Sequence, residues 1–228
     1  MRRLVCAAAL LLIGCEARAG ALAFPAPGFF MEYRVEAFSE GRRSEERFTL
    51  RVEEDLGGER RLLSLSVDSG AVYRAVYSAG PGEAGPFALS RFERVESREE
   101  GRWQVLAPEE LELLRTLAGM QDRLAAGRAE ADSTLRVGGR DWSAQRFALT
   151  DSSESTQRSA SVTLTRRIVS RGRAWITTAL PFGGWLRFEE ERVARKVSEI
   201  GGRRYVGEPE TNREVWTLVA VGAVTPNK

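Results

Sequence analysis

The chain of 228 residues contains no histidine. Histidine is the usual general base of serine triads and a common ligand of catalytic metals, so its absence excludes both of these kinds of site. The sequence also lacks a Gly-x-Ser-x-Gly elbow, a phosphate-binding glycine loop followed by lysine, and a dinucleotide fingerprint. We therefore expect no catalytic residue, no metal site and no cofactor, and a protein that is not an enzyme.

Cysteine and lysine are both scarce. The two cysteines, Cys6 and Cys15, lie near the N-terminus, so the body cannot form a disulfide and must depend on its core. Lysine occurs only at Lys196 and Lys228, and the net charge of +2 is carried mainly by arginines that alternate with glutamates. Because such mixed charge does not form the single-sign patch of a nucleic-acid-binding surface, we expect no nucleic-acid partner.

The N-terminus has the pattern of an export signal. Arg2 and Arg3 precede an apolar run from Leu4 to Ile13. A run of about ten residues is long enough for the core of a signal peptide and well short of the roughly 20 that span a bilayer. We expect residues 1–14 to be a signal peptide.

The end of that run, Leu12-Ile13-Gly14-Cys15, resembles the lipobox of bacterial lipoproteins. The resemblance implies that Cys15 is lipidated and becomes the new N-terminus. The protein would then be anchored to a membrane of the bacterial cell envelope and face the periplasm or the exterior. Residues 15–28, rich in alanine and proline, would form a flexible tether.

Ordinary secretion is the alternative to lipidation. The triplets ending at Ala19 and Ala23 both have the small-x-small pattern of a signal-peptidase site. Cleavage at either of them would give a plain secreted protein of unknown function.

Residues 29–228 are predicted to form an antiparallel β domain. Apolar and polar residues alternate from Met31 to Ala37 and again from Phe48 to Val52. Alternating segments flank four Gly-Gly pairs, which are typical of tight hairpin turns: Gly57-Gly58, Gly138-Gly139, Gly183-Gly184 and Gly201-Gly202. The Ser- and Thr-rich stretch from Thr150 to Ser161 is expected to be an exposed loop.

One segment changes its period. Pro108 and the acids after it suit a first helical turn, a stripe of leucines follows, and Gly127 suits the end. This pattern predicts a helix at about 108–127 that lies across one face of the sheet. The predicted fold is mainly β, with a single antiparallel, strongly curved sheet or incomplete barrel and one central helix.

This architecture resembles the half-barrel of periplasmic lipoprotein carriers and of related mycobacterial lipid-binding lipoproteins. In those families a curved sheet and covering helices enclose an apolar cavity. The resemblance implies that the curved sheet of this chain binds a lipid or another apolar ligand.

A second resemblance is local. The stretch from Trp175 to Trp185, with its Pro-x-Gly-Gly turn, is similar to a hairpin of uncharacterised bacterial envelope proteins. Trp175, Phe182, Trp185 and Phe188 gather a large apolar area around this turn, and one interpretation is a rim that grips an apolar ligand. In the other interpretation, these aromatic residues fill the core at a hairpin corner.

Runs of carboxylates are interpreted as solvated surface. In Glu189-Glu190-Glu191, the first and third side chains share one face of a strand and Glu190 points to the other. Nearby arginines can neutralise them, so a pair of catalytic carboxylates is not favoured. Glu96 is likewise predicted to lie on the surface.

Two functions are consistent with the sequence. In the first, a lipid-anchored, non-enzymatic protein binds a lipid or another apolar ligand in its curved sheet, within a void of roughly 300 to 1,000 Å³. In the second, a structural or interaction lipoprotein with a filled core docks another envelope component. The expected partners are the membrane, through the lipid anchor, and either a lipid or an envelope protein.

Overall fold

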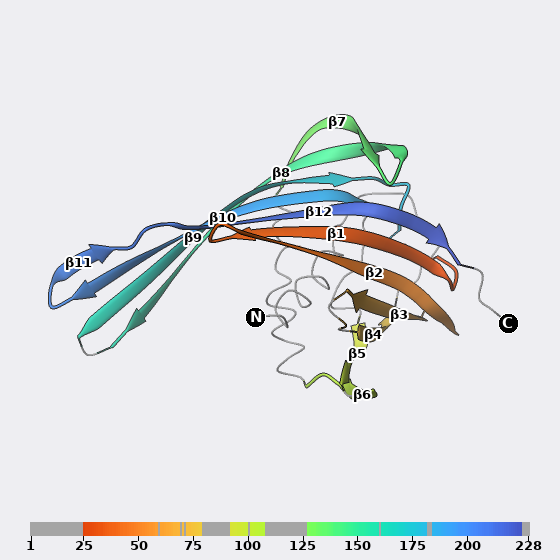
Figure 1. The fold of residues 1–228 in the computed structure, drawn as a ribbon, viewed down its shortest axis with the longest axis horizontal. Coiled ribbons are helices and arrows are strands. Elements are labelled where there is room, and N and C mark those ends of the chain that lie inside the picture. The colour runs from red at the N-terminus through yellow and green to blue at the C-terminus, as the bar shows by residue number, and fades with distance from the viewer. Residues whose placement is uncertain are drawn as a thin grey trace.

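The computed structural model describes residues 25–58, 60–68, 70, 72–78, 92–99, 101–107, 127–159, 161–181 and 184–224. These residues form one twelve-stranded antiparallel sheet that is not closed (Figure 1). The prediction of a mainly β, single antiparallel sheet is therefore confirmed. Cys15, Phe182 and the predicted helix from 108 to 126 lie outside the described residues.

The sheet consists of two meanders in which neighbouring strands follow one another in sequence, except that β12 pairs with β10. The first contains β1 (Phe29–Ser39), β2 (Arg42–Gly57), β3 (Arg60–Val67), β4 (Val72–Ser78), β5 (Phe92–Glu99) and β6 (Arg102–Val105). The second contains β7 (Arg128–Val137), β8 (Arg140–Arg158), β9 (Val162–Ile176), β10 (Trp185–Ile200), β11 (Arg203–Val206) and β12 (Glu210–Ala223). The first and last strands, β1 and β12, pair and join the meanders.

Glycine turns connect the strands where they were predicted. Gly138-Gly139, with φ of 58° and 75°, closes the β7–β8 hairpin, and Gly201-Gly202, with φ of 57° and 77°, closes the β10–β11 hairpin. Positive φ at both central residues is the geometry that matches the twist of paired strands. The β1–β2 turn has the same geometry, but its first residue is Glu40, with φ of 50°, and the sequence did not predict it.

The core lies on one face of the sheet, here called the interior face. Met31, Leu50 and Leu218 are almost fully buried on this face. Phe48 stacks on Tyr33 with ring centroids 5.0 Å apart and meets Trp216 edge-on at 4.8 Å. Because each large apolar side chain contributes roughly 1.5 to 3 kcal/mol on burial, this face is the main source of stability.

The expectation of a loop from Thr150 to Ser161 is wrong. β8 continues to Arg158, and Arg158 is in register with Thr163 of β9, so only a short turn separates the two strands. Serine and threonine predominate because both faces of this part of β8 are exposed, which removes the apolar alternation that identifies a strand. β9 and β10 are likewise long, uninterrupted strands.

β8, β9 and β10 extend beyond the body of the sheet, and the short β11 pairs with the end of β10. β7 pairs with β8 only as far as Ala148, and β1 ends at Ser39, opposite Asn212 of β12. Beyond these points β8, β9, β10 and β11 form a twisted arm, which projects to the left in Figure 1. We define the arm as residues 150–158, 162–171 and 191–206, among which only Ser170 and Ala194 are buried.

Candidate functional site

A groove of about 720 Å³ runs along one face of the arm. Its walls are alternate residues of β9 and β10, with single contributions from β8 and β11. This alternation places every lining side chain of a strand on the same face. The lining residues are Glu154, Thr163, Thr165, Arg167, Val169, Arg171, Glu191, Val193, Arg195, Val197, Glu199 and Arg204.

Two arginines lie opposite each other at the centre of the groove. Arg167 of β9 is in register with Arg195 of β10. The next rung toward the body is the apolar pair Val169 and Val193, and the next rung toward the tip contains Val197. Like charges directly opposite on neighbouring strands repel each other, so this rung stabilises neither strand.

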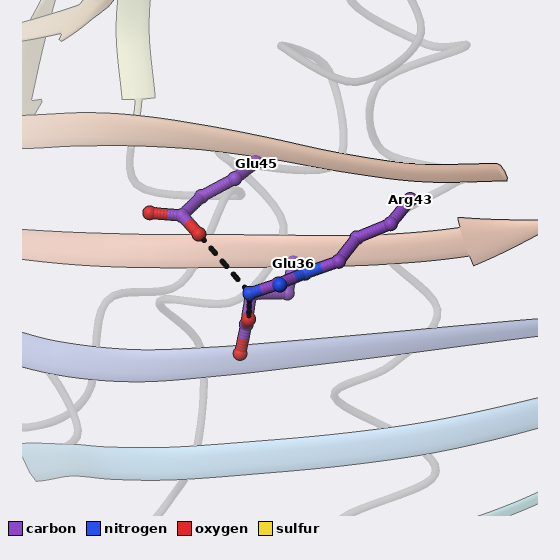
Figure 2. Close-up of polar contacts among 3 residues, drawn as sticks. All are labelled: Glu36, Arg43 and Glu45. Atoms are coloured by element: carbon purple, nitrogen blue, oxygen red, sulfur yellow. Dashed lines mark hydrogen bonds and ion pairs between the residues drawn. The ribbon is translucent and has the colours of Figure 1, made fainter.

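On the outer face of the body, two arginines form ion pairs with glutamates. Figure 2 shows Arg43 of β2 bridging Glu36 of β1 and Glu45 of β2, the latter at 3.3 Å. Arg47 similarly lies 3.1 Å from Glu32. Arg43 and Arg47 are therefore neutralised by neighbours within the sheet.

The arginines of the groove have no such partner. No ion pair or hydrogen bond reaches the guanidinium of Arg167 or Arg195 from any residue that the structure describes. Glu154 is the register partner of Arg167 on β8 and also lines the groove, but the two do not form an ion pair. The centre of the groove therefore presents two cationic groups that can accept an anion.

A second polar cluster lies on the interior face where the arm meets the body. Glu190 is 6% exposed and accepts hydrogen bonds from Arg192, with Nε 2.8 Å from Oε2. Its register partner on β12 is Glu214, which accepts a hydrogen bond from the indole of Trp216. Glu190 points to the face opposite Glu189 and Glu191, as expected, but the interpretation of this run as solvated surface is wrong for Glu190.

Burial raises the pKa of the Glu214 carboxyl. The hydrogen bond from Trp216 and the charge of Arg192 lower it in part, and the nearby Glu190 raises it further. Two carboxylates that face each other across buried strands compete for ionisation. The two facing carboxyl groups therefore differ in their surroundings, since Glu190 is bound by Arg192 and Glu214 by the indole of Trp216.

Glu96 was predicted to lie on the surface, and this prediction is wrong. The residue is 5% exposed and makes ion pairs with Arg74 and Arg94. The hydrogen bond from Arg74 lowers its pKa. Since the two arginines neutralise it, Glu96 has the role of a structural ion pair in the β4–β5 region.

Of the four aromatic residues proposed as a ligand rim, the structure describes three, and it brings two of these together. The rings of Trp185 and Phe188 meet edge-on with centroids 5.6 Å apart, and both residues are buried on the interior face. Trp175 lies on the face of β9 opposite to the buried Ala174. The guanidinium carbon of Arg187 is 5.9 Å from the centroid of its ring.

A β-bulge explains the burial at the start of β10. The register shifts between Trp185 and Arg187, so Trp185 and Leu186 are both buried although they are consecutive. The indole Nε1 of Trp185 is buried and has no hydrogen-bond partner among the residues that the structure describes. An unsatisfied donor of this kind is rare in a folded interior.

Sequence reasoning missed the arm arginines because it could not supply the register. The alternation of Thr163, Thr165, Arg167 and Val169 was a usable signal that these residues share a face. That Arg195 lies opposite Arg167 depends on the length of the β9–β10 connection, from Thr177 to Gly184, which composition does not reveal.

The fold and the groove define an open, single-sheet β protein with a projecting arm. No protein-family model matches the chain, and no curated protein matches it. Among solved structures, it is similar to a protein of Bacteroides fragilis described as exported and as having a YmcC-like fold, with 11% identity and a TM-score of 0.25. The likeness covers 89% of this chain and 99% of that one.

Two further features concern all of the residues that the structure describes. No helix there is long and apolar enough to cross a membrane. In the same residues, no group of three or more histidine, cysteine or acidic side chains is arranged to hold a metal ion.

Proposed function

We propose that this chain is a lipid-anchored, non-enzymatic protein of the bacterial cell envelope that docks another envelope component through its arm. The anchor is Cys15, at the end of the lipobox-like Leu12 to Cys15. A lipid on this residue and the proline-containing tether after it would hold the body close to a membrane surface while leaving the arm accessible.

The proposed docking function is based on the exposed arm. It extends three strands beyond the core, although only Ser170 and Ala194 among its residues are buried. Such an extension contributes little apolar burial and exposes backbone and charge, so its role in stability is small. Its tip also exposes Ile200, Tyr205 and Val206, at 47%, 53% and 58%. An exposed apolar tip beside a charged groove is typical of an interaction surface.

Binding of a lipid or another apolar ligand on the interior face is the second candidate. The observation that favours it is the buried, unpartnered indole Nε1 of Trp185, which lies beside Phe188. A ligand with an apolar chain and a carbonyl oxygen would accept this hydrogen bond. The arm groove does not suit such a ligand, because seven of its twelve lining residues are charged.

The anchor is tested by Cys15→Ser. We expect the variant to leave the membrane fraction, because each buried CH₂ of an acyl chain contributes about 0.8 kcal/mol to anchoring and the variant carries none. Fractionation and intact-mass analysis measure the result. A mature protein that begins at Gly20 or Phe24 without acyl mass would support plain secretion instead.

Docking is tested by site-specific photo-crosslinking in cells. A photoreactive amino acid replaces Thr165, which lines the groove, or Ser155, which is exposed on the opposite face of the arm. We expect a discrete crosslinked product of constant mass from position 165 and none from position 155. Equal products from both positions, or none from 165, would contradict docking through the groove.

Native mass spectrometry separates the two candidates. The purified protein should carry no co-purifying lipid beyond its own anchor if docking is the function. A stoichiometric lipid that is lost in Trp185→Phe, which removes the indole donor but keeps an aromatic ring, would establish the second candidate.

A further inference from the structure

We propose that Arg167 and Arg195 bind a phosphate group carried by the component that the arm docks. The inference rests on the proposed docking function and names the chemistry that the same groove recognises. Within one sheet, Arg43 and Arg47 on the outer face of the body are neutralised by glutamates, whereas no residue that the structure describes pairs with Arg167 or Arg195.

The geometry of the central rung suits an anion with two charges. Directly opposed residues on antiparallel strands have Cβ atoms about 4.5 to 5.5 Å apart, so the two guanidinium groups can converge on one ligand. Each guanidinium offers a planar fork of N–H donors that matches phosphate oxygens. A phosphate monoester with a charge of about −1.5 to −2 would neutralise both Arg167 and Arg195 and relieve their mutual repulsion.

Other charges in the groove leave its centre positive. Glu191 is in register with Arg171 toward the body, and Glu199 is in register with Arg204 toward the tip. Glu154, the β8 neighbour of Arg167, lies beside the central rung. The rung of Glu154, Arg167 and Arg195 therefore has a net charge of +1, with the two cations adjacent.

The floor of the groove strengthens the attraction. Val169, Val193 and Val197 flank the arginines and are half-buried, whereas Arg167 and Arg195 are exposed. Apolar side chains beside the guanidinium groups reduce the local polarity, and hydrogen bonds to a bound anion gain strength in such surroundings. A ligand can reach the site from solvent because both arginines are exposed.

The test uses inorganic phosphate as the probe and the lipidated full-length protein in detergent. Isothermal titration calorimetry at constant ionic strength compares the parent with the double variant Arg167→Gln/Arg195→Gln. We expect the variant to bind phosphate at least about tenfold more weakly, because it loses both charged forks. Screening should also weaken binding to the parent as salt is raised.

The matched control changes the other face of the same two strands. Arg166 and Lys196 are sequence neighbours of the proposed pair and are in register with each other, but they do not line the groove. Arg166→Gln/Lys196→Gln also removes two positive charges and should change phosphate affinity less than about twofold. Glu154→Gln should strengthen binding, since it removes the acid beside Arg167.

Three results would overturn the proposal. These are no phosphate binding by the parent, equal weakening by both double variants, and no gain from Glu154→Gln. The last variant keeps the test decisive even if Arg167→Gln/Arg195→Gln is poorly folded, because it removes no groove arginine. Thermal unfolding of each variant monitors the fold.

Mixed micelles identify the source of the phosphate. If micelles with phosphatidylglycerol compete with inorganic phosphate and micelles with phosphatidylcholine do not, the ligand is an anionic lipid headgroup. If neither competes, the phosphate belongs to a soluble or polymeric component. Arginine-dependent phosphate binding without a crosslink from position 165 would contradict the docking function and support the anion site. A crosslink from position 165 without arginine-dependent phosphate binding would support docking and contradict the anion site.

Discussion

The hydroxyl of Tyr33 donates a hydrogen bond to the backbone carbonyl of Trp185, at 3.0 Å, although the two residues are 152 positions apart. Tyr33 lies on β1 and Trp185 begins β10, so the bond passes across β12, which lies between them in the sheet. The contact fixes the bulged start of β10 against the first strand. It therefore joins the two meanders on the interior face, in addition to the ladder between β1 and β12.

Tyr33→Phe should remove this bond without opening a cavity. We expect the free energy of unfolding to fall by about 1 kcal/mol, as for a buried hydrogen bond between neutral groups. Burial also raises the pKa of the Tyr33 phenol, so the parent should lose stability as pH rises above about 10, where the unfolded phenol ionises. Urea unfolding at pH 7 and pH 10.5 measures both effects. A parent and variant of equal stability would show that the bond is not formed in solution.

Gly184 should tolerate alanine much less well than Gly139 does. Both have positive φ, of 61° and 75°, so alanine costs roughly 1 to 2 kcal/mol of backbone strain at either position. A Cβ at Gly184 would clash with the carbonyl oxygen of Thr177, whereas one at Gly139 meets no described atom within 4 Å. We expect Gly184→Ala to cost about 2 kcal/mol more than Gly139→Ala, measured by thermal unfolding. Similar melting temperatures would contradict this close approach.

Glu96 should stabilise the fold in a pH-dependent way. Glu96→Gln weakens the charge-assisted bonds from Arg74 and Arg94, and we expect a loss of about 1 to 2 kcal/mol at pH 7. Because the folded pKa is lowered, the contribution is present above the unfolded value of about 4.3 and is lost as pH falls below it. The two proteins should therefore converge in stability toward pH 3 in urea unfolding.

Glu93→Gln is the matched control for Glu96. Glu93 is 42% exposed in its ion pair with Arg60, so its replacement should change the free energy of unfolding by less than about 1 kcal/mol. A larger effect at Glu93 than at Glu96 would mean that burial does not distinguish these two pairs.

The sequence predicted local structure where one residue type or one period was sufficient. Gly138-Gly139 and Gly201-Gly202 identify hairpin turns because only glycine adopts positive φ freely. Glu40 adopts it too, but nothing in its side chain indicates this. The alternation from Met31 to Val35 identifies β1 because one face of that strand is buried.

The candidate site depended on relationships that the sequence does not contain. The strands of the arm are exposed on both faces, so β8 beyond Thr150 has the composition of a loop. Glu190 was assigned to a solvated run, but one face of β10 is interior at that position. The pairing of Arg167 with Arg195 is a property of register, which the hydrophobic pattern specifies weakly where neither face is buried.

Glu214→Gln should stabilise the protein at neutral pH. The folded pKa of Glu214 is raised, mainly by burial, so the folded state binds its proton more tightly than the unfolded chain does. Below about pH 4.3 the carboxyl is protonated in the folded and the unfolded states, so it does not lower the free energy of unfolding. As pH rises from that value through the folded pKa, the unfolded chain ionises more readily and stability is lost. Glutamine keeps an oxygen that can accept the hydrogen bond from Trp216 and never ionises. We expect a gain of about 1 kcal/mol at pH 7.5 and none at pH 4, measured by urea unfolding.

Its register partner provides the contrast. Glu190→Gln removes the negative charge that Arg192 binds, so this substitution should cost about 1 to 3 kcal/mol at pH 7.5. The two replacements are chemically identical and lie opposite each other on neighbouring strands, so a difference in sign between them can come only from the different surroundings of the two carboxyl groups. If Glu214→Gln also lost stability at pH 7.5, then Glu214 would be ionised and held by Arg192, and the two carboxylates would share that arginine.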